Sequence, residues 1–397
     1  MKNTLILFLF AICIIYCGLS GCTHDKIEIS SDEVISPIKT MKPILRVYIE
    51  NSGSMDGYMC DGSQLKDAIF DYVSDLKGLS DETELYYINS NIIPFEDSLG
   101  EYIKTMKPST FKRAGGNLSN SDIGSMIGNI LNNMNDSTVC LFISDCILDL
   151  PTIDSQKYLN NCQISIKNAI NDGRQHIPDL GVQVLKLLSD FNGKYFYQNG
   201  LVDELKEVKR PYYIWIFGDS NVLANLNSEV PLSGLNKYDL EGYASFTKKI
   251  EIPYDIKNKS ITSSVINPVK GDYNVTIRAD FRATLQSETE IQNSSNYSFN
   301  NPSLFIENIQ PITAKDSKYT HFISFVIPSG IKVAQDNLVF NAPKMPSWVI
   351  ESNDDSGKDV KNNLNKTTGI KYLIEGVVDS YKKDIISTNF KFTIKRI

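Results

Sequence analysis

Residues 44–226 alternate between short apolar runs and segments with helical spacing of apolar residues, and this alternation constrains the fold more than any other feature. The apolar runs lie at 44–49, 85–88, 138–144, 182–188 and 212–217, and the helical segments lie at 64–76, 123–134 and 157–173. Strands that alternate with helices are typical of a parallel sheet covered on both faces. Residues 212–217 contain no charged residue, as expected for such a strand. We therefore predict an α/β domain over residues 43–226, with a Rossmann-like, mostly parallel sheet flanked by helices.

The pattern changes after about residue 240. Strand-like runs at 273–281, 321–327 and 389–397 are separated by clusters of Asn, Ser, Gly and Pro. This pattern predicts a mainly antiparallel β-sandwich over residues 240–397. One helical period, near 370–381, predicts a single helix packed on the sandwich. Because 397 residues exceed what one core usually serves, we expect two domains that meet near residues 227–242.

The first residues have the features of a secretory signal. Lys2 precedes an unbroken apolar run at 5–16, and Leu19-Ser20-Gly21-Cys22 closes it. The run is well short of the ~20 apolar residues that a membrane-spanning helix needs. Leu19-Ser20-Gly21-Cys22 resembles the lipobox of bacterial lipoproteins. The resemblance implies that residues 1–21 are removed as a signal peptide and that Cys22 carries a diacylglycerol and a further acyl chain such as palmitate.

Such an anchor implies that the folded part of the chain works outside the cytoplasm, attached to a membrane of the cell envelope. Thr23 rather than aspartate follows the cysteine, and the resemblance to enteric lipoproteins then implies the outer membrane rather than the inner one. Residues 22–42 combine serines with scattered charges and show no sustained period, so we expect them to form a tether.

Charge and cysteine content limit which classes of partner and which kinds of metal site or disulfide we expect. The formal net charge is −7, and no basic run is present that could follow a phosphate backbone, so nucleic acid is not an expected partner. Four cysteines follow Cys22, namely Cys60, Cys140, Cys146 and Cys162. An oxidising compartment permits disulfides between them, but their spacing does not fix a pairing and does not match a zinc site.

Oxygen-bearing side chains come directly after the predicted strands. Glu50, Ser52 and Ser54 follow the run at 44–49, Ser121 precedes the helix that begins at 123, and Asp145 follows the run at 138–144. We expect these segments to meet at the carboxyl edge of the sheet, where α/β proteins bind ligands. Five oxygen donors suit a hard divalent cation such as Mg²⁺, with Mn²⁺ or Ca²⁺ as alternatives.

This arrangement resembles the metal-ion-dependent adhesion site of the von Willebrand factor A (VWA) family, over roughly residues 44–226. Ser52 and Ser54 match the two serines of the family's Asp-x-Ser-x-Ser loop, Ser121 stands for its threonine, and Asp145 matches its second aspartate. Glu50 stands where the family has its first aspartate. The resemblance implies a binding or cell-adhesion protein without enzymatic activity, in which the cation leaves one position for a carboxylate from a protein ligand.

Two other functions remain open. A structural or scaffold lipoprotein could carry the same loop as a degenerate metal site. An esterase is the remote alternative, because Gly218-Asp219-Ser220 resembles the nucleophile block of SGNH hydrolases. That serine needs a histidine base. Neither His176 nor His321 has an aspartate three residues before it, as that family requires, and His24 belongs to the tether.

Side chains near the predicted cation site are open to two interpretations. Tyr58 and Met59 either line the ligand surface or fix the turn to the core. Asp56, Asp61 and Asp122 are expected to be solvated loop residues or helix caps rather than cation ligands.

Overall fold

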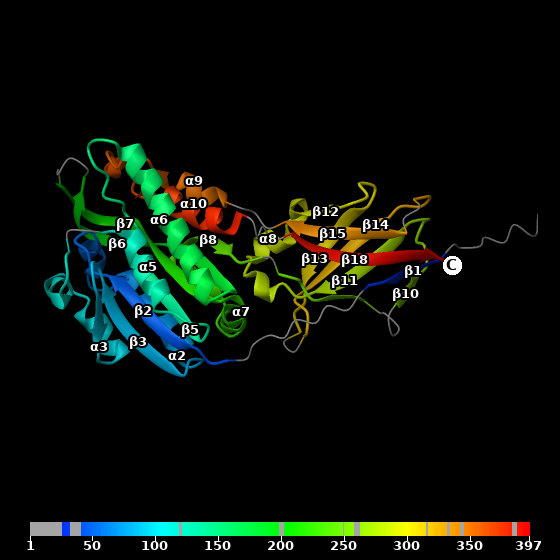
Figure 1. Ribbon diagram of the computed structural model, residues 1–397, viewed down its shortest axis with the longest axis horizontal. Coiled ribbons are helices and arrows are strands. Elements are labelled where there is room, and N and C mark those ends of the chain that lie inside the picture. The colour runs from blue at the N-terminus through cyan, green and yellow to red at the C-terminus, as the bar shows by residue number, and fades with distance from the viewer. Residues whose placement is uncertain are drawn as a thin grey trace, which may run out of the picture.

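The computed structural model describes residues 26–31, 41–118, 121–197, 202–248, 250–257, 263–314, 317–331, 334–341, 345–382 and 387–397. Two bodies lie side by side, a mixed α/β body and a pair of antiparallel sheets (Figure 1). The predicted signal peptide, Cys22 and His24 lie outside the described residues. Over the described ranges, no helix is both long and apolar enough to cross a membrane.

The α/β body is built on a seven-stranded sheet with the order β4-β3-β2-β5-β7-β6-β8. Its strands are β2 (Ile44–Glu50), β3 (Glu82–Ile88), β4 (Ile92–Phe95), β5 (Thr138–Ser144), β6 (Leu180–Phe196), β7 (Val202–Asp219) and β8 (Leu240–Phe246). Strand β2 pairs in parallel with β3 and with β5, and the other four strand pairs of this sheet are antiparallel. The prediction of a mostly parallel sheet is therefore wrong. Strand β7 returns from β6 as a hairpin and lies directly against β5, which needs no crossover helix.

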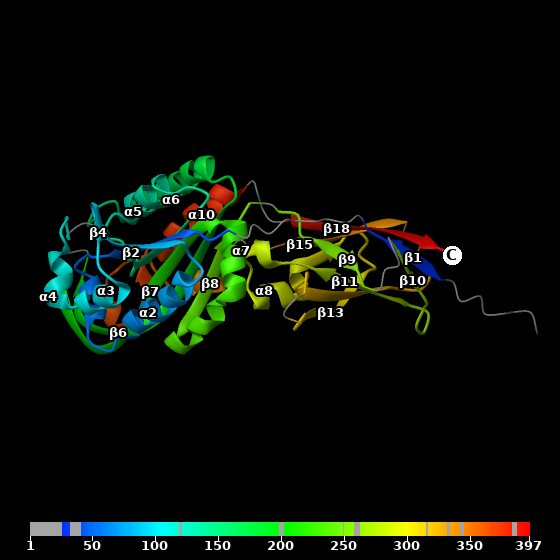
Figure 2. The ribbon, with the colours of Figure 1, turned by 90° about the horizontal axis from the view of Figure 1, so that it is seen from below.

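Helices cover both faces of this sheet (Figures 1 and 2). Side chains of α2 (Gln64–Lys77), α3 (Leu99–Thr105) and α7 (Ser220–Glu229) share one buried core, and those of α5 (Ile123–Asn132), α6 (Ser155–His176) and α10 (Ile370–Tyr381) share the other. The described part of this body also contains four 3-10 turns and four short elements. The turns are η1 (Met55–Met59), η2 (Lys112–Ala114), η3 (Leu232–Tyr238) and η6 (Val360–Asn362). The short elements are α4 (Pro108–Phe111), α9 (Ser347–Glu351), β16 (Asn353–Asp354) and β17 (Thr367–Thr368).

Helix α10 has the predicted bounds, but it does not pack on the sandwich. Its buried residues Leu373, Ile374 and Val377 join the core around α6 and the seven-stranded sheet. Gly376 permits the close approach, because a Cβ atom there would lie 2.5 Å from the carbonyl oxygen of Gln163 on α6. A helical period shows which face is apolar and not which surface covers that face.

The α/β body also extends past residue 226. Strand β8 pairs with β6 from Val182↔Phe246 to Leu187↔Leu240, so residues 240–246 belong to the seven-stranded sheet and not to the sandwich. The chain then forms most of the second body, returns to the first through residues 345–382, and ends in the second.

The second body contains a five-stranded sheet, β10-β1-β18-β15-β12, and a four-stranded sheet, β13-β14-β11-β9, both antiparallel. Their strands are β1 (Ile27–Ser30), β9 (Tyr254–Ile256), β10 (Ser263–Ile266), β11 (Tyr273–Ala279), β12 (Tyr297–Phe299), β13 (Phe305–Pro311), β14 (His321–Ile327), β15 (Gln335–Asn341) and β18 (Ser387–Arg396), with η4 (Arg282–Thr284), α8 (Glu288–Gln292) and η5 (Ser294–Asn296) between them. The two sheets share one core. Strand β1 falls inside the predicted tether, where the structure instead shows Ile27 and Ile29 buried in that core.

We predict that Leu373→Ala lowers the free energy of unfolding of the α/β body by about 2–5 kcal/mol, because it leaves a cavity in a core. Glu375→Ala on the same helix is the control, since it removes only the 3.7 Å pair with Lys371, worth roughly 0.3–0.5 kcal/mol. Urea unfolding followed by tryptophan fluorescence measures both, because both tryptophans of the chain, Trp215 and Trp348, pack in this body. Equal effects of the two changes would show that α10 does not pack on the α/β body.

Candidate functional site

Two carboxylates come together at the carboxyl edge of the parallel strands. Glu50 is the last residue of β2, and Asp145 directly follows β5. Because Ile49 pairs with Ile143 in a parallel register, the two strands end at the same level. Ser121 approaches from the start of α5, and its hydroxyl donates a 2.7 Å hydrogen bond to Oε1 of Glu50.

The carboxylate of Glu50 is fully buried. Its second oxygen, Oε2, accepts a hydrogen bond from the hydroxyl of Ser144 at the end of β5. Burial raises the pKa of the Glu50 carboxyl, and hydrogen bonds from Ser144, Ser121 and Ser52 oppose this increase. Glu50 is therefore held by hydroxyl groups on both of its oxygens.

Asp145 is also buried, but only one of its oxygens is satisfied. Oδ1 accepts a 3.1 Å hydrogen bond from the backbone N–H of Ile147, whereas Oδ2 has no hydrogen-bond partner among the described residues. Burial and the charge of Glu50 raise the pKa of Asp145 to about 7. The nearby Ser54 hydroxyl, the backbone N–H of Ile147 and the positive charge of Arg210 each lower this pKa and limit the increase. A buried oxygen without a partner is unfavourable by roughly 1–3 kcal/mol, more if it is charged.

Arg210, a buried arginine on β7, was not predicted from the sequence to belong to the site. Its Nη1 donates to the carbonyl oxygen of Leu364 at 3.3 Å, and its Cζ lies 4.9 Å from the ring centre of Tyr195. Nε and Nη2 have no hydrogen-bond partner in the described part of the chain. The Arg210 charge lowers the pKa of Asp145, so this side chain partly balances that buried carboxylate. A basic residue two positions before the apolar run at 212–217 is the signal that could have pointed to it.

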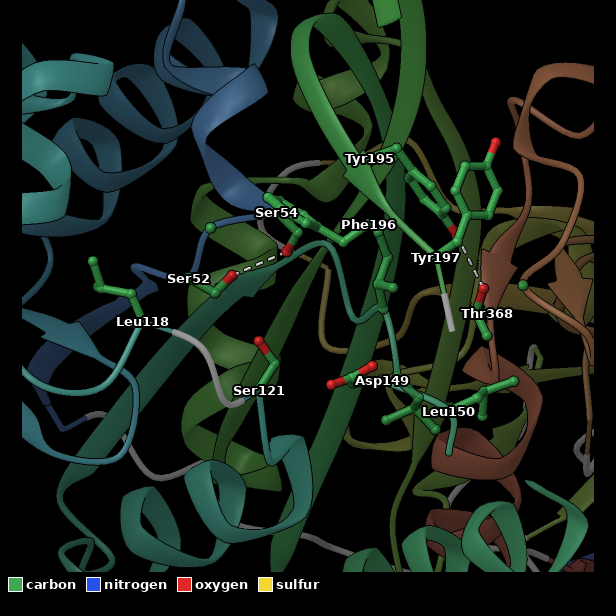
Figure 3. Close-up of a pocket in the computed structure, with 14 residues that line it drawn as sticks. Ser52, Ser54, Leu118, Ser121, Asp149, Leu150, Tyr195, Phe196, Tyr197 and Thr368 are labelled. Atoms are coloured by element: carbon green, nitrogen blue, oxygen red, sulfur yellow. Dashed lines mark hydrogen bonds between the residues drawn. The ribbon is translucent and has the colours of Figure 1, made fainter. Parts of the chain in front are cut away.

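A pocket of about 540 Å³ opens beside these side chains (Figure 3). The predicted residues Ser52, Ser54 and Ser121 contribute to its lining, and the hydroxyls of Ser52 and Ser54 lie 3.0 Å apart. Gly53 lies in the same turn, and the remaining lining residues are Leu118, Ile147 to Leu150, Tyr195 to Tyr197 at the end of β6, Gly357 and Thr368.

The structure decides whether Tyr58 and Met59 line the ligand surface or fix the turn after β2 to the core. Tyr58 and Met59 are fully buried, and the Tyr58 hydroxyl donates to the carbonyl oxygen of Pro211 at 2.6 Å, so they fix the turn to the core. A Cβ atom at Gly57 would lie 2.3 Å from the ring of Phe191, so the contact of this turn with β6 needs glycine. Asp122 caps α5 through the backbone N–H of Ser125.

Ser220 and the four cysteines are not among the lining residues of this pocket. The Ser220 side chain is buried at the start of α7, and Asp219 caps that helix through the N–H of Asn221. His321 lies in the other body, hydrogen-bonded to Glu288 and Thr320. All four cysteines, Cys60, Cys140, Cys146 and Cys162, are free thiols, and the indole N–H of Trp215 donates to the sulfur of Cys146 at 3.3 Å.

The donor set fits a hard cation better than a soft one. Within the described ranges, no three or more His, Cys, Asp and Glu side chains gather in a group that could hold a metal ion. Glu50 and Asp145 instead stand with three serine hydroxyls, all oxygen donors. The oxygen of Asp145 that lacks a partner is the group that a cation would satisfy.

No protein-family model matches the chain, and comparison with the curated proteins finds no match.

We predict that Asp145→Asn removes a pH dependence of stability. Because the folded pKa of Asp145 lies above its ordinary value of 3.8, the folded state binds more protons than the unfolded state between pH 4 and about 7. Stability of the metal-free chain therefore falls as pH rises through this range, and the asparagine variant loses this part of the slope. Thermal melts in EDTA at pH 4.5, 6 and 8 measure it, with the exposed Asp149→Asn as control. Parallel curves for wild type and Asp145→Asn would contradict the assignment.

Proposed function

We propose that this chain is a lipid-anchored binding protein of the bacterial cell envelope, which holds a divalent cation at Glu50 and Asp145 and captures a carboxylate of a protein partner. The observation that carries the proposal is the buried Oδ2 atom of Asp145, which lacks a hydrogen-bond partner among the described residues. Buried charged oxygens are ordinarily paired or bound to a metal.

Asp145, Ser52, Ser54 and Ser121 would hold the ion, with Glu50 either in contact or linked through water. The bound ion would supply positive charge that attracts a carboxylate. Residues of the chain keep the place ready: Ser121 and Ser144 orient Glu50, and the backbone of Ile147 orients Asp145. The three parallel strands β3, β2 and β5 and the loops that follow β2 and β5 support a VWA-like interpretation of this half of the body.

Glu50 is the main departure from the VWA pattern. Its extra methylene lets one carboxylate accept hydrogen bonds from both Ser121 and Ser144. We infer that Glu50 replaces the shorter aspartate by spanning the distance between α5 and β5, so a glutamate at this position is compatible with the proposed cation.

The arrangement of the two bodies fits presentation of the pocket away from a membrane. Strand β1 starts one residue after Lys26, whose N–H donates to the carbonyl oxygen of Ile397. If Cys22 is acylated, Lys26 lies within about 14 Å of the anchor, the greatest length of four residues. The antiparallel body then stands next to the membrane, whereas the β6–β7 hairpin that lines the pocket lies at the opposite end (Figures 1 and 2).

A scaffold lipoprotein with a degenerate site is the second candidate, and Arg210 favours it. This guanidinium already places a positive charge near Asp145, and serine hydroxyls satisfy both oxygens of Glu50. A chain with these contacts can remain folded without a cation.

We predict that Mg²⁺ raises the melting temperature of the wild-type chain, because an ion at 100 times its Kd stabilises the folded state by about 2.7 kcal/mol. Asp145→Ala and Glu50→Ala should abolish Mg²⁺ and Mn²⁺ binding in isothermal titration, while Glu50→Asp retains it. Asp61→Ala, whose side chain is exposed and outside the pocket lining, is the control and should bind as wild type does. If wild type binds neither ion at millimolar concentration and melts identically with Mg²⁺ and EDTA, the scaffold function replaces the proposal.

Lipid attachment has a separate test. Cells that express the chain and are fed a labelled fatty acid should label the wild-type protein and not Cys22→Ser, because Cys22 is the proposed acylated residue. Cys60→Ser removes a thiol of the folded part and should label as wild type does. Label retained in Cys22→Ser, or residues 1–21 still present in the labelled protein, would disprove this anchor.

A further inference from the structure

The pocket beside the proposed cation has an apolar wall that the capture of a carboxylate alone does not use. Phe196, near the tip of the β6–β7 hairpin, lines this pocket and is 50% exposed. Its ring lies 3.6 Å from the position of a Cβ atom at Gly53, between Ser52 and Ser54. An exposed aromatic ring therefore lies against the turn that carries two of the proposed cation ligands (Figure 3).

The neighbours of Phe196 leave its ring as the free aromatic surface of this wall. The Tyr195 hydroxyl is 3.2 Å from Oγ1 of Thr368, and the Tyr197 hydroxyl donates to Asp203 at 2.7 Å. The two tyrosine rings also pack edge to face on each other at 5.0 Å. Their polar groups are thus engaged within the chain.

Apolar side chains also come from other segments of the lining. Leu148 and Leu150 follow β5, and Leu118 lies beside the Gly53 turn, whose N–H donates to the Leu118 carbonyl oxygen at 3.2 Å. A pocket of about 540 Å³ lies within the range that proteins use for specific ligands, and its combination of hydroxyls with apolar side chains is typical of such sites. A carboxylate would fill only a small part of it.

The exposed apolar surface continues beyond the pocket. Val202 pairs with Phe196 across the hairpin, and its side chain is 46% exposed. Two adjacent exposed apolar residues, Phe196 in the pocket lining and Val202 beyond it, fit a polypeptide segment that crosses the hairpin better than a small free acid, which would stay inside the pocket.

The base of the hairpin is fixed to the cation-site turn. A Cβ atom at Gly193 would lie 2.6 Å from the Cα atom of Gly57, and Tyr58 packs edge to face on Phe191 with ring centres 4.9 Å apart. The hairpin and the turn after β2 are therefore packed as one unit. This packing sets the position of Phe196 relative to Ser52 and Ser54.

We propose, building on the proposed function, that the partner is a protein segment in which an acidic residue is followed by an aromatic or branched aliphatic residue, and that Phe196 selects for that second residue. The acidic side chain meets the cation at the serines, and its neighbour packs on Phe196 and the leucines after β5. Removing the ring lowers affinity for such a segment by about tenfold, since one partly buried apolar contact is lost. It leaves cation binding unchanged, because Phe196 offers no oxygen ligand.

The test uses the full mature chain and four capped peptides, Ac-Gly-Asp-Phe-Gly-NH2, Ac-Gly-Asp-Gly-Gly-NH2, Ac-Gly-Asn-Phe-Gly-NH2 and Ac-Gly-Lys-Phe-Gly-NH2, titrated by calorimetry with Mg²⁺ or EDTA. The Asp-Phe peptide should bind wild type about tenfold more tightly than the Asp-Gly peptide, and only with Mg²⁺ present. Phe196→Ser should lose that preference while keeping the wild-type Mg²⁺ affinity. Val265→Ser, at a 55% exposed valine of β10 in the other body, is the matched control and should keep it.

Normal Mg²⁺ binding without any preference for the Asp-Phe peptide, or with the preference intact in Phe196→Ser, overturns this inference and leaves the proposed function standing. Tighter binding of the Lys-Phe peptide also overturns it, because the pocket would then select a cation. Absence of Mg²⁺ binding in wild type overturns the proposed function, and this inference with it.

Discussion

The burial of two carboxylates at the ends of adjacent parallel strands is the constraint on which the rest of the pocket depends. Glu50 and Asp145 are both buried, and burial raises the pKa of each. Like charges that approach in a low-dielectric interior need compensation from hydrogen bonds or opposite charge. Serine hydroxyls provide it for Glu50, and Arg210 provides part of it for Asp145. The remaining oxygen of Asp145 is where the proposed cation completes the balance.

The unusual course of the chain around the sheet encloses these carboxylates. Because β7 returns from β6 as a hairpin, Arg210 of β7 lies 4.9 Å from the ring centre of Tyr195, and Tyr195 to Tyr197 at the end of β6 line the pocket. Residues 345–382 return from the second body to the first. Within them, the hydroxyl of Thr368 lies 3.2 Å from the hydroxyl of Tyr195. The pocket therefore depends on segments that lie far apart in the sequence, from Ser52 to Thr368.

Elements whose pattern lies within a short stretch of sequence could be predicted. Buried parallel strands are continuous apolar runs, so β2 and β5 were predicted within one residue of their observed bounds, and the polar residues that follow them were predicted to converge. Glu50 and Ser121 do meet. The path of β6 and β7 was missed because both strands continue past the sheet as a hairpin with polar residues such as Lys206. The surfaces on which α10 and β1 pack are formed by segments that are distant in the sequence. The spacing of apolar residues within α10 or β1 does not identify those surfaces.

Direct observation of a bound ion is the sharpest test of whether a divalent cation binds beside Asp145. Crystals of the mature chain grown with Mn²⁺, with data collected at the manganese absorption edge, should show one strong anomalous peak in contact with Asp145 and with the hydroxyls of Ser52 and Ser54. The same peak should be absent from crystals of Asp145→Asn grown under the same conditions. A wild-type map without a peak at this position, with Oδ2 of Asp145 paired to Arg210 instead, would contradict the account and identify the buried carboxylates as structural.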